Sequence, residues 1–244
     1  ATGTNNVDLE AARQRGVAVC NLHDYCTSSV VQHVMGLLLL LTQRLWEYDA
    51  LVRSGAWQRG EQFCRLDYPI RELAGRCICI AGFGTLGRGV ASAARSFGMQ
   101  VLVANLPGRP RRADRMDLRE LLPRADVLSL HCPLSAATER MIGAEELSLM
   151  KRDAVLINTA RGALVDSAAL AAALREGRLG GAAVDVLPQE PPVDGDPLLD
   201  PTIPNLIITP HVAGAAREAR RLCIDEMAEN VADFLRGGRR GRVV

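Results

Sequence analysis

Three polar residues follow apolar runs that predict buried strands: Arg161 comes after "LINTA", Glu190 after "AAVDVLPQ" and His211 after "LIITP". In an open α/β sheet, ligands bind in the crevice beyond the carboxyl ends of the strands, where these side chains are expected to meet. A histidine that titrates near neutrality can donate a proton to a carbonyl oxygen, and a neighbouring carboxylate favours its imidazolium form. A guanidinium can polarise the carbonyl and hold a carboxylate. The three together suit hydride transfer to a 2-oxo acid.

Each of these residues also has a structural explanation when it is taken alone. Arg161 could be a solvated loop residue, Glu190 could belong to a Pro-rich loop, and His211 could cap a strand. Their joint placement at strand ends favours the catalytic interpretation.

A glycine-rich loop lies between an apolar strand and a helix of small residues in "CICIAGFGTLGRGVASAARSFG". Gly82, Gly84 and Gly87 have the spacing that provides a tight turn, close approach of backbone to a pyrophosphate, and close packing of helix on strand. The start of the helix offers unpaired N–H groups to the phosphates. The motif predicts dinucleotide binding, and the alternative is a purely structural turn.

The second strand is predicted to end near Asn105, where many dinucleotide-binding domains carry a carboxylate that binds the adenosine ribose. The segment "NLPGRPRR" instead adds Arg109, Arg111 and Arg112. Loss of the carboxylate removes repulsion of a ribose 2′-phosphate, and a guanidinium can pair with that phosphate. The sequence therefore favours NADPH, while the alternative is that these arginines are solvated and NADH binds.

From residue 77 onward, short apolar runs alternate with longer amphipathic ones, a pattern typical of βαβ units in a Rossmann-type, doubly wound parallel α/β sheet. The predicted strands are 77–81, 100–104, 127–131, 154–159, 182–186 and 206–209. The predicted helices are 9–15, 29–45, 86–97, 118–122, 144–150, 167–176 (with Asp166 as N-cap) and 215–235. Residues 17–20 are expected to form a short strand, and "GGRRGRVV" a frayed tail.

Composition excludes several classes of partner. The 29 basic and 28 acidic residues of the 244-residue chain nearly cancel, so neither nucleic acid nor an anionic membrane is expected. A small molecule is the expected partner, and no metal site is predicted. The apolar stretch 34–41 is too short to cross a bilayer. Seven cysteines without framework spacing indicate reduced thiols in a cytoplasm.

Several motifs resemble the D-isomer-specific 2-hydroxyacid dehydrogenase family through essentially the whole chain: "GFGTLG", "HCPLSAATERMIG", "LMKRDAVLINTARGALVD", "GAAVDVLPQEPP" and "LIITPH". The resemblance implies that Arg161 binds the substrate carboxylate and carbonyl, that Glu190 orients and charges the histidine, and that His211 is the acid–base residue. It places the backbone amides of Thr2 and Gly3 on the substrate carboxylate, and Tyr25 nearby. The implied cofactor contacts are Thr85, Leu86, Asn105, Pro133, Thr138, Thr159, Ala160, Asp185 and Gly214, with Asp185 at the nicotinamide carboxamide.

Within the family, "ATGTNNVD" and "NLPGRP" are similar to glycerate dehydrogenases, which implies hydroxypyruvate or glyoxylate as substrate. The absence of a tryptophan from "HVAGAA" departs from that group. A D-3-phosphoglycerate or D-lactate dehydrogenase, or a member that binds cofactor without catalysis, remains an alternative. Formate oxidation is disfavoured because it needs no acid–base pair.

The resemblance also implies a domain division. Residues 1–25 correspond to the last part of a split, flavodoxin-like substrate domain, 26–213 to the cofactor domain, and 214–244 to a helix that returns to the substrate domain. Because the chain opens on "ATGTNN" without an initiator methionine, we expect it to begin within a longer protein. The apolar helix 29–45, followed by Trp46, Tyr48 and Trp57, predicts a homodimer interface.

Overall fold

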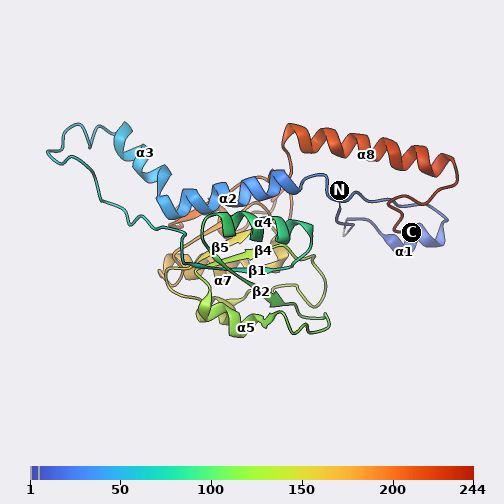
Figure 1. Ribbon diagram of the computed structural model, residues 1–244, viewed down its shortest axis with the longest axis horizontal. Helices are drawn as coiled ribbons and strands as arrows, with labels where there is room; N and C mark the ends of the chain where they lie inside the picture. Colours follow the sequence, from blue (N-terminus) through green and yellow to red (C-terminus); the bar gives the residue numbers. More distant parts are fainter. Residues whose placement is uncertain (1, 5) are drawn as a thin grey trace.

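The computed structural model describes residues 2–4 and 6–244, and in these residues one seven-stranded parallel sheet forms the centre of the molecule (Figure 1). The strands are β1 (Cys77–Ala81), β2 (Gln100–Asn105), β3 (Met116–Asp117), β4 (Val127–Leu130), β5 (Val155–Asn158), β6 (Gly181–Val184) and β7 (Leu206–Ile208). Their order is β3-β2-β1-β4-β5-β6-β7, so the strand order reverses direction between β1 and β4. The predicted doubly wound sheet is confirmed, and folds of this kind bind their ligands beyond the carboxyl ends of the strands near such a reversal.

All six predicted strands are present, and β1 has the predicted bounds. The sequence missed β3, which contributes only two residues and pairs with Ala104 and Asn105 of β2. A two-residue strand is too short to show the alternation on which strand prediction depends.

Helices cover both faces of the sheet (Figure 1). On one face, α2 (Thr27–Gln43) and α4 (Thr85–Ser96) bury Ile78 and Ile80 of β1. The other face is covered by α5 (Leu118–Leu121), α6 (Ala144–Leu149) and α7 (Ser167–Arg175). The Asp166 side chain caps α7 as predicted, accepting the N–H of Ala169 at 3.0 Å. Burial of each large aliphatic side chain stabilises the fold by about 1.5–3 kcal/mol.

The predicted helix 29–45 is instead two helices. α2 ends at Gln43, and α3 (Leu45–Arg53) begins after Arg44, whose φ of 55° is left-handed. The bend brings the Arg44 guanidinium within 2.8 Å of the Asn205 amide oxygen and 2.6 Å of Glu47. No helix in the described part of the chain is long and apolar enough to cross a membrane.

The two ends of the chain pair with one another. α1 (Leu9–Gln14) and α8 (Arg217–Leu235) lie together at one end of the molecule and project away from the sheet (Figure 1). The predicted strand 17–20 is wrong, because only Cys20 forms an isolated bridge, to Arg242. The tail predicted to be frayed is held by the N–H of Val243, which donates to Val19 O at 2.8 Å. Long-range pairing of this kind leaves no local signal in the sequence.

Candidate active site

The glycine-rich loop connects β1 to α4 and leaves an open cradle. Gly82 has a φ of 105°, and a Cβ there would lie 2.5 Å from the carbonyl carbon of His131. A Cβ at Gly87 would lie 2.0 Å from Gly82 O, so both positions exclude any side chain. At Gly84 a Cβ would meet no atom within 4 Å, and no side chain caps this helix start. The space and the N–H groups of α4, which begins at Thr85, therefore fit a phosphate of a dinucleotide.

Arg161 follows β5 in a turn that is held by the Asn158 side chain on one side and by the backbone of Leu187 on the other. The buried Asn158 side chain accepts the N–H of Ala160 at 3.1 Å and donates to Arg161 O at 2.8 Å. The Arg161 guanidinium donates to Ala160 O at 2.6 Å. A Cβ at Gly162 would lie 1.9 Å from the carbonyl carbon of Leu187, so only glycine lets this turn pack against the end of β6.

His211 and Glu190 form the expected pair. Glu190 Oε2 lies 2.7 Å from His211 Nδ1, and Glu190 Oε1 accepts the N–H of Leu187 at 3.0 Å. The carboxylate is therefore held by the backbone while it orients the ring. Because a carboxylate can only accept, His211 carries a proton on Nδ1. Its Nε2 then faces away from Glu190 and is free to exchange a proton with a substrate.

Asp185 is 1% exposed and is the centre of a hydrogen-bond cluster at the end of β6. Its Oδ1 accepts the N–H of Val212 at 2.9 Å, and its Oδ2 accepts the N–H of Ala213 at 2.8 Å. The Thr209 hydroxyl also donates to Oδ1. Asp185, the residue expected at the nicotinamide carboxamide, thus forms hydrogen bonds with the backbone segment that directly follows His211.

A cavity of about 340 Å³ brings together residues that are far apart in the sequence. Among the residues predicted to form the site, its lining includes Thr2, Tyr25, Leu86, Thr159, Arg161, Asp185, His211 and Gly214. Burial raises the pKa of Tyr25 to about 12, so its hydroxyl stays protonated at neutral pH. The buried Thr159 hydroxyl has no hydrogen-bond partner among the described residues, which fits a polar ligand in this cavity.

Other predicted residues lie outside this lining. Glu190 lines an adjoining apolar cavity of about 390 Å³, which shares Asp185 and His211 with the first. Gly3 and Ala160 do not line either cavity. Thr138 is 3% exposed and donates to Pro133 O at 2.9 Å, so the two residues fix the loop after β4.

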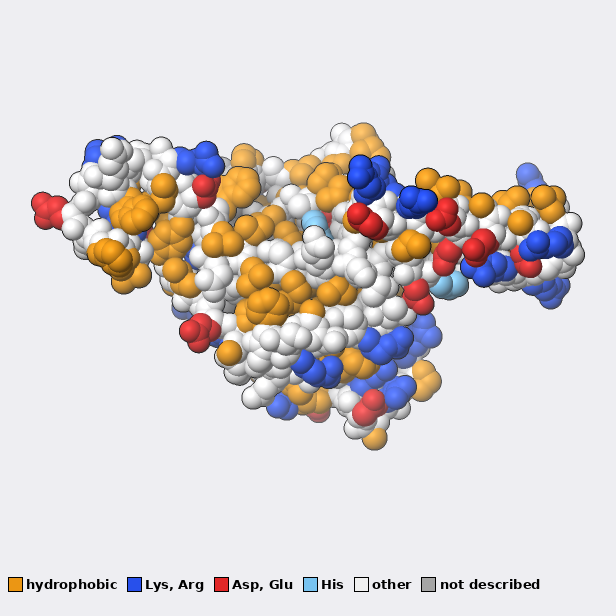
Figure 2. Space-filling view, turned by 45° about the horizontal axis from the view of Figure 1, so that its top comes forward, with side chains coloured by type: hydrophobic (Ala, Val, Ile, Leu, Met, Phe, Trp, Pro, Cys, Tyr) orange, Lys and Arg blue, Asp and Glu red, His pale blue; other side chains and the backbone are white. Residues whose placement is uncertain are grey.

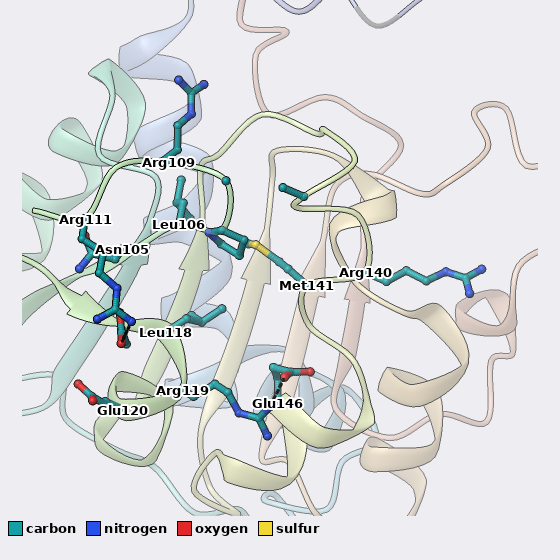
Figure 3. Close-up of a pocket in the computed structure, with 14 residues that line it drawn as sticks. Asn105, Leu106, Arg109, Arg111, Leu118, Arg119, Glu120, Arg140, Met141 and Glu146 are labelled. Atoms are coloured by element: carbon teal, nitrogen blue, oxygen red, sulfur yellow. Dashed lines mark hydrogen bonds and ion pairs between the residues drawn. The ribbon is translucent and has the colours of Figure 1, made fainter.

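Asn105 and Arg109 line a separate cavity of about 680 Å³ at the end of β2 (Figure 3). The Asn105 side chain accepts the N–H of Arg112 at 3.0 Å and so closes the loop that follows β2. Arg111 is paired with Asp117, and Arg112 with Asp114 at 3.0 Å. In Figure 3, Arg109 and Arg140 extend from opposite sides of the cavity, with Met141 between them.

Sequence reasoning missed three residues of this region. Asn158 holds the turn of Arg161, and its position at a strand end before "TARG" is a signal that could have found it. Arg220 of α8 lines the cavity of Arg161 and His211. His33 of α2 contacts Thr209. Neither Arg220 nor His33 stands out in the sequence, because both are brought in by distant helices.

A dinucleotide cradle beside a histidine–carboxylate pair is typical of dehydrogenases that use a nicotinamide cofactor. The model of the D-isomer specific 2-hydroxyacid dehydrogenase NAD binding domain matches residues 35–213. The chain belongs to this family of NAD(P)-linked oxidoreductases.

Known relatives resemble this chain along nearly its whole length. It is 46% identical over 237 residues to a glycerate dehydrogenase of Methylorubrum extorquens, covering 97% of this chain and 74% of that protein. A D-lactate dehydrogenase from Aquifex aeolicus, complexed with NAD and lactic acid, has 30% identity and a TM-score of 0.86, with 97% and 75% covered. An acyclic imino acid reductase in complex with NADPH and D-Arg has 29% identity and a TM-score of 0.88, with 100% and 76% covered.

Proposed function

We propose that this protein reduces a small 2-oxo acid, hydroxypyruvate or glyoxylate, to the corresponding D-glycerate or glycolate. The observation that carries the proposal is the Glu190–His211 pair, 2.7 Å apart, beside the cavity that Arg161 also lines. The similarity to a glycerate dehydrogenase supports hydroxypyruvate, since oxidation of glycerate at C2 gives that ketone.

Each site residue has a role in this reaction that follows from its contacts. The Arg161 guanidinium would bind the substrate carboxylate and polarise the carbonyl, while the backbone near Thr2 and Gly3 shares the carboxylate. His211 would donate its Nε2 proton to the carbonyl oxygen, and Glu190 would stabilise the imidazolium through Nδ1. The bound nicotinamide supplies the hydride. The cradle at Gly82, Gly84 and Gly87 would hold the cofactor's pyrophosphate.

NADPH is the proposed cofactor, in preference to NADH. The end of β2 carries Asn105 where a carboxylate would repel a 2′-phosphate, and Arg109 lies four residues further on. The Arg109 guanidinium makes no hydrogen bond or ion pair with residues 2–4 and 6–244, so it is available to a ligand. The remaining predicted contacts (Thr85, Leu86, Pro133, Thr138, Thr159, Ala160, Asp185 and Gly214) are assigned to the same cofactor.

The assembly is proposed to be a homodimer. Large apolar side chains are exposed on α3 and on the segment that follows it, where Trp46 is 75%, Leu66 79% and Phe63 96% exposed. Figure 2 shows hydrophobic side chains gathered over this end of the molecule. A patch of this kind indicates a protein interface. Light scattering that gives the mass of one chain at micromolar concentration would refute the dimer.

The domain division and the location belong to the same proposal. We assign 1–25 and 214–244 to the substrate domain and 26–213 to the cofactor domain; the matched residues 35–213 support this division. The proposed location is the cytoplasm, because seven cysteines without framework spacing are typical of reduced thiols.

Steady-state kinetics test the proposed function. We expect reduction of hydroxypyruvate and glyoxylate, with NADPH giving the higher kcat/KM, and lower kcat/KM with pyruvate and with 3-phosphohydroxypyruvate. Equal or tighter binding of NADH would contradict the cofactor preference. A chain that binds cofactor but reduces none of the four acids would refute the enzymatic proposal.

A further inference from the structure

His33 of α2 lies against the end of the strand that leads to His211. Its Nε2 is 3.1 Å from the Thr209 hydroxyl oxygen, and its side chain is 21% exposed. The Thr209 hydroxyl in turn donates to Asp185 Oδ1, which lies 3.7 Å from His33 Nε2. A continuous hydrogen-bond chain therefore joins α2 to the carboxylate of Asp185.

The direction of each hydrogen bond in this chain is fixed by the groups themselves. The Asp185 carboxylate accepts two backbone N–H groups, and toward Thr209 it also accepts. A hydroxyl has only one proton, so Thr209 must accept from His33. His33 therefore carries a proton on Nε2. Without a proton on this nitrogen, the hydrogen bond from His33 to Thr209 would be lost.

Asp185 holds the whole segment that carries His211. Three successive N–H groups donate to it: that of His211 to the backbone oxygen at 2.7 Å, that of Val212 to Oδ1 and that of Ala213 to Oδ2. His211 has a φ of 55°, a left-handed conformation that is unfavourable for a residue with a side chain and persists only where its surroundings enforce it. Whatever fixes the Asp185 carboxylate therefore also fixes the two residues that directly follow His211.

We propose that His33 is a positioning residue: by donating to Thr209 it orients the Asp185 carboxylate, which holds the N–H groups of Val212 and Ala213 and so restricts the backbone that directly follows His211. Its effect on turnover rests on the proposed acid–base role of His211, whereas its effect on the backbone does not. His33 itself touches neither the cavity of Arg161 and His211 nor the glycine cradle.

Two variants of His33 and one control test the proposal. His33→Leu removes the donor and places an apolar side chain next to the apolar segment 34–41 of α2. His33→Gln keeps an N–H group at nearly the same distance from the backbone. His23→Leu is the matched control, because that side chain is exposed and, among the described residues, His23 hydrogen-bonds through its backbone N–H, which donates to Glu226. The measurements are amide hydrogen exchange of Val212 and Ala213 by NMR without ligands, and kcat and KM for hydroxypyruvate.

We expect His33→Leu to speed exchange of both amides by about five- to tenfold, the factor that corresponds to one buried hydrogen bond. The value of kcat falls by a similar factor while KM stays within about twofold, because substrate binding by Arg161 is unchanged. His33→Gln restores both quantities, and His23→Leu changes neither.

Thr209→Val provides a second, independent test. If His33 acts through Thr209, the double variant with His33→Leu exchanges no faster than Thr209→Val alone. Additive effects, normal exchange in His33→Leu, or failure of His33→Gln to restore protection in a stably folded protein would each overturn the inference. Faster exchange in a protein that shows no reductase activity would leave the positioning role intact and refute the proposed function.

Discussion

The region around Arg161 and His211 and the loop at the end of β2 hold their charged groups in different ways. Around Arg161 and His211 the functional groups are fixed by backbone atoms: Glu190 accepts the N–H of Leu187, and Arg161 donates to Ala160 O. At the end of β2 the guanidiniums are exposed, and the side chain of Arg111 is 77% exposed although it is paired with Asp117. One region is a rigid frame and the other is a charged loop.

This difference corresponds to two different tasks. Proton transfer requires donor and acceptor within hydrogen-bond distance in a fixed direction, so it needs a rigid frame. Discrimination between NADPH and NADH depends on the charge of a 2′-phosphate, which an exposed guanidinium can meet without exact placement. Changes in the first region should therefore alter turnover, and changes in the second should alter cofactor affinity alone.

The largest expected effect is that of His211→Ala. Removal of the proton donor should lower kcat for hydroxypyruvate by about 10²–10⁴-fold, the contribution typical of acid–base groups. The cofactor dissociation constant should change by less than about twofold, because the glycine cradle is untouched. Stopped-flow turnover and fluorescence titration measure the two quantities. A loss of turnover of only a few fold would show that another group donates the proton.

The sequence predicted the elements that have a local signal. The β1–Gly82–α4 unit and the strand-end positions of Arg161, Glu190 and His211 follow from apolar periodicity and glycine spacing, and the structure has these residues at strand ends as expected. The bend at Arg44 was missed because it depends on Asn205, 161 positions away. The role of Asp185 as a clamp was missed for a similar reason: its partners are backbone amides of another strand end, and any residue type can supply these.

Gly162→Ala tests the rigid frame without touching a charged group. The added methyl would overlap the backbone of Leu187, so we expect the free energy of unfolding to fall by about 2–3 kcal/mol. The matched control is Gly36→Ala in α2, where a Cβ meets no atom within 4 Å and helix propensity predicts a gain of up to about 1 kcal/mol. Urea denaturation measures both. Equal stability of the two variants would contradict the close packing of the Arg161 turn.

Arg109→Ala tests the charged loop. Loss of a guanidinium that pairs with a 2′-phosphate should weaken NADPH binding by about tenfold and leave NADH binding within about twofold. Arg111→Ala is the control, since that guanidinium is already paired with Asp117 and should contribute less. Isothermal titration calorimetry of both variants with NADPH and with NADH gives the four dissociation constants. An equal loss for NADH and NADPH in Arg109→Ala would place this residue on a part common to both cofactors.

The smallest expected effect separates the two regions by ionic strength. Exposed charges on the loop after β2 are screened by salt, so raising NaCl from about 0.05 to 0.5 M should weaken NADPH binding by about two- to fivefold more than NADH binding. The Glu190–His211 pair is held at 2.7 Å by direct contact, and kcat at saturating cofactor should change much less. If kcat falls with salt as steeply as NADPH affinity, the catalytic pair depends on long-range charge as well, and the division between a rigid frame and a charged loop fails.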